Sequence, residues 1–432
     1  MTLANVFIQD TIVAIATYLA PSSVAIIRLS GTDAVPIAKS ICIQQNQWRS
    51  HYVLHTYIHD EQQQLVDEVL IIPMLAPRSY TRQDIVEIHC HGGVIITQTI
   101  LQLLLNKGAR LAQPGEFTLR AFLNGRLSLT QAESVLDLIY APSLSMAKKA
   151  LANLNGTVSK QIHHLRGQLI QLLAQLEVQL DFEHDDAFPI QTPLTQLITF
   201  IDQLLQTPSQ WYRYGIRVAI LGDANVGKST LFNALVEEER SIVTSIPGTT
   251  VDVIETSIQW KQTCFRFFDT AGFKTVCSEI ESKALAKTQQ IANNCDLILW
   301  VTDSEISIPN SLTKPIILVF NKIDRLNPTL PSLPIPMVSV SALYGWNLPQ
   351  LKQMIYEHTI QRQPDGIYLN ERQTQLLKQT KQHLLNLLEA MQKGYPLEIL
   401  SWHLKNAIQT LDENDVNQST LNAIFSQFCI GK

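Results

Sequence analysis

Hydrophobic residues change their spacing twice along the chain, and these changes divide it into three parts. Up to about residue 127, short β-branched runs at 12–16, 24–27 and 69–72 alternate with turns, and an apolar run at 101–105 suits a helix. Between about 128 and 212, apolar residues recur every three or four positions, as in amphipathic helices: Ile162, Leu165, Leu169, Leu172, Leu173, Leu176 and Leu180. The same spacing returns after about 360: Leu376, Leu377, Leu384, Leu387, Leu388 and Met391, then Leu397, Leu400, Leu404, Ile408 and Leu411.

The middle segment alternates between strands and helices. Its apolar, strand-like runs lie at 217–221, 265–268, 297–301, 316–320 and 337–340. This alternation predicts a mostly parallel, doubly wound sheet. Because helical blocks flank the segment, we predict an α/β domain inserted into a single helical domain. The predicted fold is multidomain: an α+β domain at 1–127, a helical domain at 128–212 plus 359–432, and the inserted α/β domain at 213–358.

Composition narrows the class of protein. Hydrophobic residues make up 46% of the chain, which is enough for several cores, and the net charge of −5 argues against a broad nucleic-acid-binding surface. No apolar run reaches the ~18 residues of a membrane helix, and the first ten residues do not resemble a signal peptide. The six cysteines form no CxxC pair and no zinc spacing. We therefore expect a protein of the cytoplasm, with reduced cysteines and no membrane partner.

Residues 222–229 read GDANVGKS and fit the phosphate-binding pattern GxxxxGK[ST]. The motif follows an apolar strand and precedes a helical stretch, which is the context that it needs. Its glycines allow backbone N–H groups to surround phosphates at a helix N-terminus. Lys228 is expected to neutralise the β- and γ-phosphates and Ser229 to bind Mg²⁺. This motif alone does not distinguish GTP from ATP.

Later motifs favour guanine. The carboxylate of Asp324, in the sequence NKID at 321–324, can accept hydrogen bonds from guanine N1–H and N2–H₂, which adenine lacks. The N–H of Ala342, in the sequence SAL at 341–343, can reach guanine O6. We therefore predict a GTP site that also includes a switch loop and the sequence DTAG at 269–272: Asn225, Val226, Gly227, Lys228, Ser229, Thr230, Thr244, Ser245, Ile246, Pro247, Gly248, Thr249, Thr250, Asp269, Thr270, Ala271, Gly272, Asn321, Lys322, Asp324, Ser341 and Ala342.

One position in this site departs from many small GTPases. Phe273 follows DTAG, where those proteins carry a glutamine that orients the attacking water. A phenylalanine cannot orient water, so hydrolysis must use another residue or a bound ion. The oxygen-bearing residues Asn225 and 244–249 suggest K⁺ as that ion.

Over nearly its whole length the sequence resembles the MnmE (TrmE) family of bacterial tRNA-modification GTPases. Besides the GTPase motifs, the resemblance rests on DTIVA at 10–14, RLSG at 28–31, HCHGG at 89–93, PGEF at 114–117, AFLNGR at 121–126, LTQAE at 129–133 and FCIGK at 428–432. It implies addition of a carboxymethylaminomethyl or aminomethyl group to C5 of the tRNA wobble uridine. It further implies the flavoprotein partner MnmG (GidA), a homodimer formed by the N-terminal domain, and a heterotetramer with that partner.

The resemblance also implies roles for individual residues. A tetrahydrofolate derivative, the one-carbon donor, would contact Arg28, Glu87, Arg126 and Lys432. The hydrolytic residue would be Glu281, and Cys429 in the terminal pentapeptide would be catalytic in tRNA modification. Mg²⁺ ligands would be Ser229 and Thr250, and K⁺ ligands would be Asn225, Thr244, Ile246 (by its backbone carbonyl) and Thr249.

Other interpretations stay open at this point. A GTP-operated switch or scaffold, such as a ribosome-assembly GTPase, would share the nucleotide motifs, although the region after 358 has no basic cluster. A folate-binding one-carbon transferase with a vestigial GTPase domain is a third class, against which the intact Lys228, Ser229 and Asp324 weigh. Without the family, Arg28, Glu87 and Arg126 read as surface or salt-bridge residues, and a terminal cysteine as part of a frayed tail.

Overall fold

The computed structural model forms two compact units. One contains Met1–Leu136, Asn153–His163 and Leu411–Lys432, and the other contains Asp137–Ala152 and His164–Thr410. The residues that the structure describes are 10–43, 48–182, 190–206, 215–223, 225–237, 254–261, 263–269, 292–303, 308–309, 312–325, 334–360, 366–412 and 416–432.

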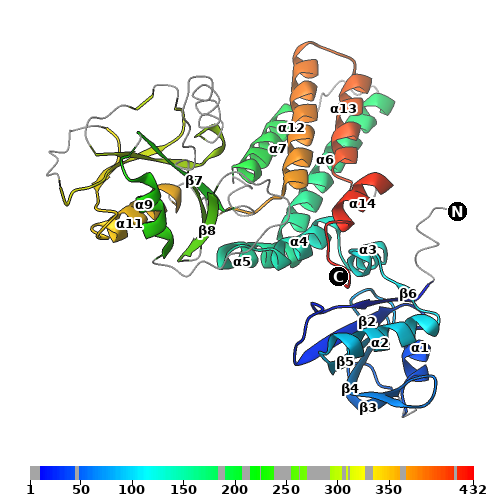
Figure 1. Ribbon diagram of the computed structural model, residues 1–432. Coiled ribbons are helices and arrows are strands. Elements are labelled where there is room, and N and C mark those ends of the chain that lie inside the picture. Colours follow the sequence, from blue (N-terminus) through cyan, green and yellow to red (C-terminus); the bar gives the residue numbers. More distant parts are fainter. Residues whose placement is uncertain are drawn as a thin grey trace, which may run out of the picture. The chain divides into compact units, whose positions relative to one another are not determined.

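The first unit is built on a six-stranded sheet in the order β3-β4-β5-β2-β1-β6 (Figure 1). Neighbouring strands are antiparallel except β1 and β6, which run parallel. The predicted runs at 12–16, 24–27 and 69–72 fall on strands, as expected, whereas the sequence pattern does not single out β3 and β5. The strands are β1 (Ile12–Ile15), β2 (Val24–Ser30), β3 (Leu54–His59), β4 (Leu65–Met74), β5 (Ile85–His91) and β6 (Arg110–Leu111).

Two helices, α1 (Ala34–Ser40) and α2 (Val94–Asn106), pack on this sheet and form its main core. Helix α2 contains the apolar run predicted to be helical and buries Ile100, Leu103 and Leu104 on one stripe. Strand β4 alternates buried and accessible residues along its length, so only one of its faces is committed to the core. The opposite face, which carries Glu68, Leu70 and Ile72, stays at least partly accessible.

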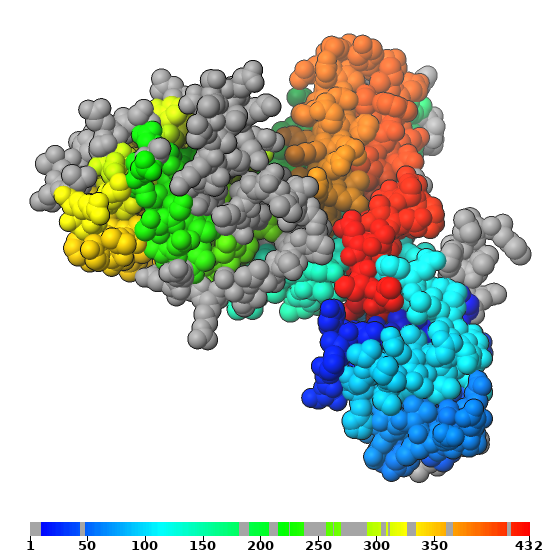
Figure 2. Space-filling model, viewed as in Figure 1, coloured from blue at the N-terminus to red at the C-terminus, as the bar shows by residue number. Residues whose placement is uncertain are grey.

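The C-terminal segment packs into the same unit. Helix α14 (Gln418–Phe425) begins at Asn417, whose side chain accepts a hydrogen bond from the Thr420 N–H at 2.9 Å. Phe425 and Phe428 then pack against α4 (Leu129–Ile139) in one apolar cluster. In Figure 2 this segment, in red, lies against the cyan residues of α3 (Glu116–Leu123). The end of the chain is therefore a packed element and not a frayed tail.

The second unit contains another six-stranded sheet, in the order β12-β11-β10-β7-β9-β8. All neighbouring pairs are parallel except β8 with β9, which confirms the predicted doubly wound α/β fold. Every strand-like run of the middle segment coincides with a strand: β7 (Ile216–Gly222), β9 (Thr263–Asp269), β10 (Leu297–Thr302), β11 (Ile316–Phe320) and β12 (Met337–Ser339), joined by the edge strand β8 (Ile254–Trp260).

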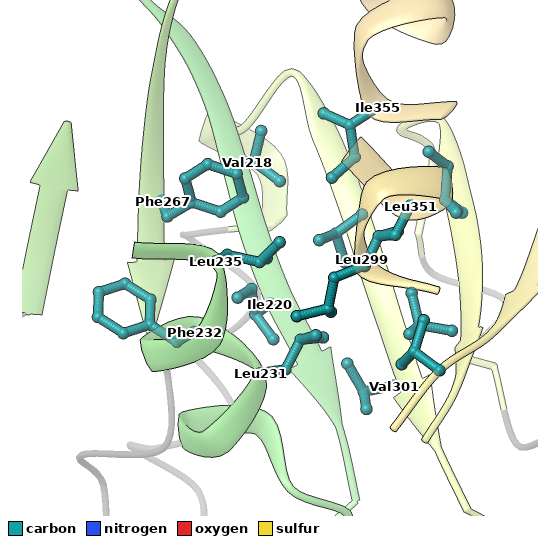
Figure 3. Close-up of a cluster of buried hydrophobic side chains, with 14 of the residues drawn as sticks. Val218, Ile220, Leu231, Phe232, Leu235, Phe267, Leu299, Val301, Leu351 and Ile355 are labelled. Atoms are coloured by element: carbon teal, nitrogen blue, oxygen red, sulfur yellow. The ribbon is translucent and has the colours of Figure 1, made fainter. Parts of the chain in front are cut away.

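This sheet is buried on both faces, as a parallel sheet should be. From β7, Val218 and Ile220 point into a cluster with α9 (Lys228–Glu237) and α11 (Leu348–Ile360), which Figure 3 shows. The alternate residues Ala219 and Leu221 join a second cluster. The carboxyl ends of β7, β10 and β11 are thereby held side by side, where the loops of the predicted site begin.

The helical blocks predicted from the 3.6-residue spacing are present. They are α5 (Leu144–Leu154), α6 (Thr157–Phe182), α7 (Gln191–Leu205), α12 (Glu371–Gln392) and α13 (Leu397–Thr410). Within the second unit, Lys381 of α12 pairs with Asp202 of α7 at 2.5 Å. Lys405 of α13 pairs with Glu177 of α6 at 3.0 Å. Among the helices described, none combines the length and the apolar character needed to cross a bilayer.

Candidate functional site

The phosphate-binding loop leaves the end of β7 and enters α9, as the motif predicts. Gly222 has φ +144°, and a Cβ placed there would lie 2.0 Å from the Val301 carbonyl oxygen of β10. A Cβ on Gly227 would lie 2.3 Å from Nδ2 of Asn321. Packing against neighbouring strand ends therefore requires both motif glycines, in addition to the room that a phosphate needs.

Lys228 lies at the first turn of α9, with its side chain folded back over the loop. Its Nζ donates hydrogen bonds to the carbonyl oxygens of Gly222 at 2.9 Å and Asp223 at 2.5 Å. Ser229 and Thr230 follow on the same turn. The helix start thus presents an ammonium group, hydroxyl groups and backbone N–H groups on one short segment, which is the chemistry that binds phosphate.

The guanine motifs meet the phosphate-binding loop through short hydrogen bonds. Nδ2 of Asn321 donates to the Val226 carbonyl oxygen at 2.9 Å, and Oδ1 of the same side chain accepts from the Ala342 N–H at 3.0 Å. The Ser341 hydroxyl donates to Oδ1 of Asp324 at 2.6 Å. Because Ser341 occupies one carboxylate oxygen, Asp324 is fixed in orientation, and its side chain is 10% exposed. The sequence predicted these residues as one site, and the structure brings them together.

Part of the predicted nucleotide site falls outside the described residues. Asp269 is the last residue of β9 and pairs in the sheet with Ile220 and Ile254; its side chain is not described. The other residues outside the description are Thr244, Ser245, Ile246, Pro247, Gly248, Thr249, Thr250, Thr270, Ala271, Gly272, Phe273 and Glu281.

A second candidate site lies in the first unit, where Arg28 and Glu87 face each other across β2 and β5. The Arg28 guanidinium donates to Oε1 of Glu87 from Nε at 2.8 Å and lies 2.7 Å from it through Nη2. Its Nη1 donates to the carbonyl oxygen of Gly431 at 3.0 Å. Nε2 of His89 is 3.4 Å from Glu87. One guanidinium therefore joins a carboxylate on the sheet to the end of the chain.

Aromatic rings connect this pair to Arg126. The guanidinium of Arg28 lies 5.8 Å from the ring centre of Phe117, and that of Arg126 lies 4.8 Å from the ring centre of Tyr80. Arg126 also donates to the Tyr80 carbonyl oxygen at 2.8 Å. Tyr80 packs against the cluster that contains Phe117, and burial raises the pKa of its hydroxyl. No predicted site included these two aromatic residues, although Phe117 lies in the motif PGEF, because isolated Phe and Tyr are ordinary core residues in a sequence.

The terminal pentapeptide completes the second site. Gly431 has φ +98°, and a Cβ there would lie 2.7 Å from the Ile15 carbonyl oxygen of β1. Cys429 is exposed, and its carbonyl oxygen accepts from the Gly115 N–H at 3.5 Å and the Lys432 N–H at 3.3 Å. Burial, reinforced by the charge of Arg28, lowers the pKa of the Lys432 ammonium. The structure thus brings Arg28, Glu87 and Lys432 together. Arg126 is linked to them through Tyr80, and Cys429 lies three residues before Lys432 in the chain.

A buried charge network fixes α3 beneath this site. The guanidinium of Arg120, 1% exposed, lies 2.5 Å from Asp10 and 3.0 Å from Glu116. Arg110 contacts the same two carboxylates at 2.6 and 2.7 Å. Although burial alone would raise the pKa values of Asp10 and Glu116, the hydrogen bonds and charges of the two arginines outweigh it and lower both. Each carboxylate is therefore stabilised in its ionised form.

Metal-ligating side chains do not gather elsewhere in the part of the chain that the structure describes. No group of three or more His, Cys, Asp or Glu there could hold an ion. The donors that fit a hard cation are at the nucleotide site, where the Ser229 hydroxyl lies at the start of α9. Lys322 contacts the backbone carbonyl of Asn225, and the Asn225 side chain is exposed.

Comparison with known protein families gives two matches that together cover most of the chain. A model described as the GTP-binding protein TrmE N-terminus matches residues 11–126, and a model described as the MnmE helical domain matches residues 129–429.

Individual relatives match the chain over its whole length. A probable tRNA modification GTPase MnmE of Cyanidioschyzon merolae is 66% identical over 446 residues, covering 100% of both chains. A tRNA modification GTPase MnmE of a Synechococcus strain is 41% identical, covering 98% of this chain and 99% of its own. Among solved structures, the G domain of the T. maritima FeoB iron transporter aligns with 33% of this chain and 98% of its own, at 26% identity and a TM-score of 0.25.

Proposed function

Because the chain belongs to the MnmE family of tRNA modification GTPases, we propose that it couples GTP hydrolysis to modification of C5 of the tRNA wobble uridine. The group added would be carboxymethylaminomethyl or aminomethyl. The binding of GTP is supported by one set of hydrogen bonds. Asn321 bonds both the phosphate-binding loop and the Ala342 N–H, and Ser341 bonds Asp324. The observation that carries the tRNA half is the end-to-end match to relatives that bear this name.

In the nucleotide half, each described residue has a specific task. Lys228 exchanges its hydrogen bonds to the carbonyls of Gly222 and Asp223 for bonds to the β- and γ-phosphates. Asp324, held by Ser341, accepts from two guanine donors, and the Ala342 N–H is fixed by Asn321 close to where O6 would lie. An adenine would leave the carboxylate without donors, which is the physical basis of selection for GTP.

Hydrolysis needs positive charge and an oriented water, and Phe273 supplies neither. We propose that Ser229 and Thr250 hold Mg²⁺, and that Asn225, Thr244, Ile246 and Thr249 hold K⁺. When bound, these ions would offset the charge that develops on the phosphates. Glu281 would orient the water. The position of Ser229 at the start of α9 and the exposed side chain of Asn225 support the assignment of these two residues.

Turnover of GTP in matched KCl and NaCl tests the hydrolytic proposal. The wild-type protein should hydrolyse GTP much faster in KCl, because a missing arginine finger or glutamine leaves a deficit of ~10³- to 10⁵-fold for another group to supply. Asn225→Ala should lose the difference between the salts while still binding GTP, and Glu281→Ala should bind GTP and hydrolyse it slowly. Equal rates in both salts for the wild-type protein would refute the role of K⁺.

In the tRNA half, the site around Arg28 and Glu87 would hold a tetrahydrofolate derivative. Glu87 can accept from the N–H edge of a pterin, and the arginines and Lys432 suit its carboxylates. The donor would supply the one-carbon unit. The thiol of Cys429 would take part in the modification. The flavoprotein MnmG and a second copy of this chain would complete the enzyme, with tRNA as the substrate.

A single cysteine substitution tests the tRNA half independently of GTP hydrolysis. Cys429→Ser should keep wild-type GTP turnover in vitro and lose the modified wobble uridine in cells, as measured by mass spectrometry of tRNA nucleosides. Cys42→Ser is the matched control, because burial raises the pKa of that thiol to about 12 and removes it from thiolate chemistry. Full modification in the Cys429→Ser strain would exclude the thiol.

A further inference from the structure

An acidic residue that no nucleotide motif includes follows the strand between the two nucleotide-binding loops. In the second sheet, β10 lies between β7, which leads into the phosphate-binding loop, and β11, which leads into the guanine loop. Asp303 follows directly after the last residue of β10. Its Oδ2 lies 2.6 Å from Nζ of Lys322, the second residue of the guanine loop, and the two side chains are only 24% and 32% exposed.

Lys322 also contacts the phosphate-binding loop. The same Nζ donates a hydrogen bond to the backbone carbonyl oxygen of Asn225 at 2.7 Å. The neighbouring residue, Asn321, bonds the next carbonyl of that loop, on Val226, at 2.9 Å. Two consecutive residues of the guanine loop thus hold two consecutive carbonyls of the phosphate-binding loop.

Both ends of the Lys322 contact are in an unfavourable backbone conformation. Lys322 and Asn225 each have φ +64°, in the left-handed region that side-chain-bearing residues rarely adopt. Such residues persist only where surrounding contacts over-determine them. The end of β10 supplies two such contacts, because the Thr302 carbonyl accepts from the Asn321 N–H at 2.8 Å and the Asp303 carboxylate holds the Lys322 ammonium.

From this geometry we infer that Asp303 is a positioning residue of the guanine-nucleotide site. It holds the Lys322 ammonium against the Asn225 carbonyl and so keeps the phosphate-binding and guanine loops in register. The inference rests on the proposed binding of GTP and adds to it a residue outside the nucleotide motifs. Without the carboxylate, Lys322 keeps its charge but loses the group that directs it, and the joint between the loops loosens.

The test is the affinity of the full-length protein for a fluorescent GDP analogue. Asp303→Asn should raise the dissociation constant roughly three- to thirtyfold, the range for losing one partner of a partly exposed charge pair at a binding site. Asp303→Glu keeps the charge, so its dissociation constant should lie between those of the wild-type protein and Asp303→Asn. If Asp303→Asn does not fold, Asp303→Glu alone carries the test, and an affinity equal to wild type would then overturn the inference.

A matched control lies at the other end of the same strand. Asp296 precedes β10 and pairs with Arg217 at 3.3 Å, away from both loops. Asp296→Asn should leave nucleotide affinity unchanged, even if it lowers the melting temperature. An equal loss of affinity in Asp296→Asn would show that any damage to β10 has the same effect, and the specific role of Asp303 would be wrong.

A double-mutant cycle separates positioning from general electrostatics. In a Lys322→Met background, Asp303→Asn should have no further effect on affinity, because the group that Asp303 directs is gone. The same additional loss in that background would overturn the inference. If wild-type protein itself bound no guanine nucleotide, the proposed function would fail instead, so the two failures are distinguishable.

Discussion

In the proposed function, guanine recognition depends on one carboxylate, that of Asp324. The Ser341 hydroxyl donates a 2.6 Å hydrogen bond to one carboxylate oxygen of Asp324. The second carboxylate oxygen lies 3.8 Å from Nε of Arg325. The motif predicted Asp324, Asn321 and Ala342 correctly as neighbours, since NKID and SAL each end a strand of the same sheet. Their interdependence comes from side-chain hydrogen bonds that spacing alone does not specify.

Asp324→Asn should weaken GTP binding about a hundredfold or more, because two hydrogen bonds to a charged acceptor, worth about 1.5–3 kcal/mol each, are lost. The same variant should gain affinity for xanthosine nucleotides, whose C2 carbonyl can accept from the new amide. Isothermal titration calorimetry measures the affinity of the variant for GTP and for the xanthosine nucleotide. Gain of xanthosine binding also shows that the variant is folded. Unchanged GTP affinity would refute the base-pocket assignment.

Other site residues could not be predicted individually. An acidic residue after a strand, such as Asp303, is common in α/β proteins, and only the three-dimensional order of β7, β10 and β11 places it between the loops. Gly431 is similar, because its need for a positive φ and for close contact with β1 exists only once the chain end is packed. Arg28, Glu87, Arg126 and Lys432 were accessible only through the family resemblance.

Gly431→Ala should release the end of the chain. The substitution places a Cβ 2.7 Å from the Ile15 carbonyl oxygen at a backbone φ of +98°. Gly108→Ala is the matched control, since Gly108 has φ +101° and no atom within 4 Å of the place that a Cβ would take, so it carries the backbone cost without the clash. Carboxypeptidase B should remove Lys432 several times faster from Gly431→Ala than from Gly108→Ala, as followed by intact mass. Equal rates would mean that Gly431 does not hold the tail.

Whole elements were the most predictable level of this protein. The 3.6-residue spacing located α6, α12 and α13, and the apolar runs of the middle segment located β7, β9, β10, β11 and β12. Strands β3 and β5 were not singled out, because polar residues such as His55 and His89 interrupt their apolar pattern. Helix α3 was not predicted from the spacing, since it is short and buries the charged residues Glu116 and Arg120.

That charge network should make the first unit sensitive to acid. Glu116 is 3% exposed and has a lowered pKa in the folded state, so its contribution to stability is fully present above the unfolded pKa near 4.5 and is lost as the pH falls through the folded pKa. Glu116→Gln should cost about 3–5 kcal/mol of unfolding free energy at neutral pH, because it removes one of the two carboxylates that offset the charge of the buried Arg120 and leaves Asp10 alone to do so. It should also flatten the stability profile as the pH falls below about 5.

Hydrogen exchange of peptides covering β1 and β2, measured across this pH range, reports the stability of the first unit. Glu389→Gln is the control, because Glu389 pairs with Lys393 at 2.6 Å on an exposed helix surface where solvent screens the interaction. Exchange should be unaltered in the control. Identical pH profiles for wild type and Glu116→Gln would contradict the role assigned to the network.

At the scale of the whole molecule, the three-part division of the sequence at about 127, 212 and 358 stays a prediction. What the structure adds is that the C-terminal residues belong to the same compact unit as the N-terminal sheet. The α/β sheet with its nucleotide motifs interrupts the helical sequence between these two ends. Cys429 and Lys432, near the end of the sequence, therefore lie in the same compact unit as Arg28, Glu87 and Arg126.

The central claim, that this chain is a GTPase that modifies tRNA, is tested most directly by mass analysis of wobble uridines. Transfer RNA from a strain lacking the protein should lose the C5-linked group, and expression of the wild-type chain should restore it. Lys228→Ala, which removes the phosphate-binding ammonium, should fail to restore it although the protein accumulates. An unchanged set of wobble uridines in the strain lacking the protein would contradict the account.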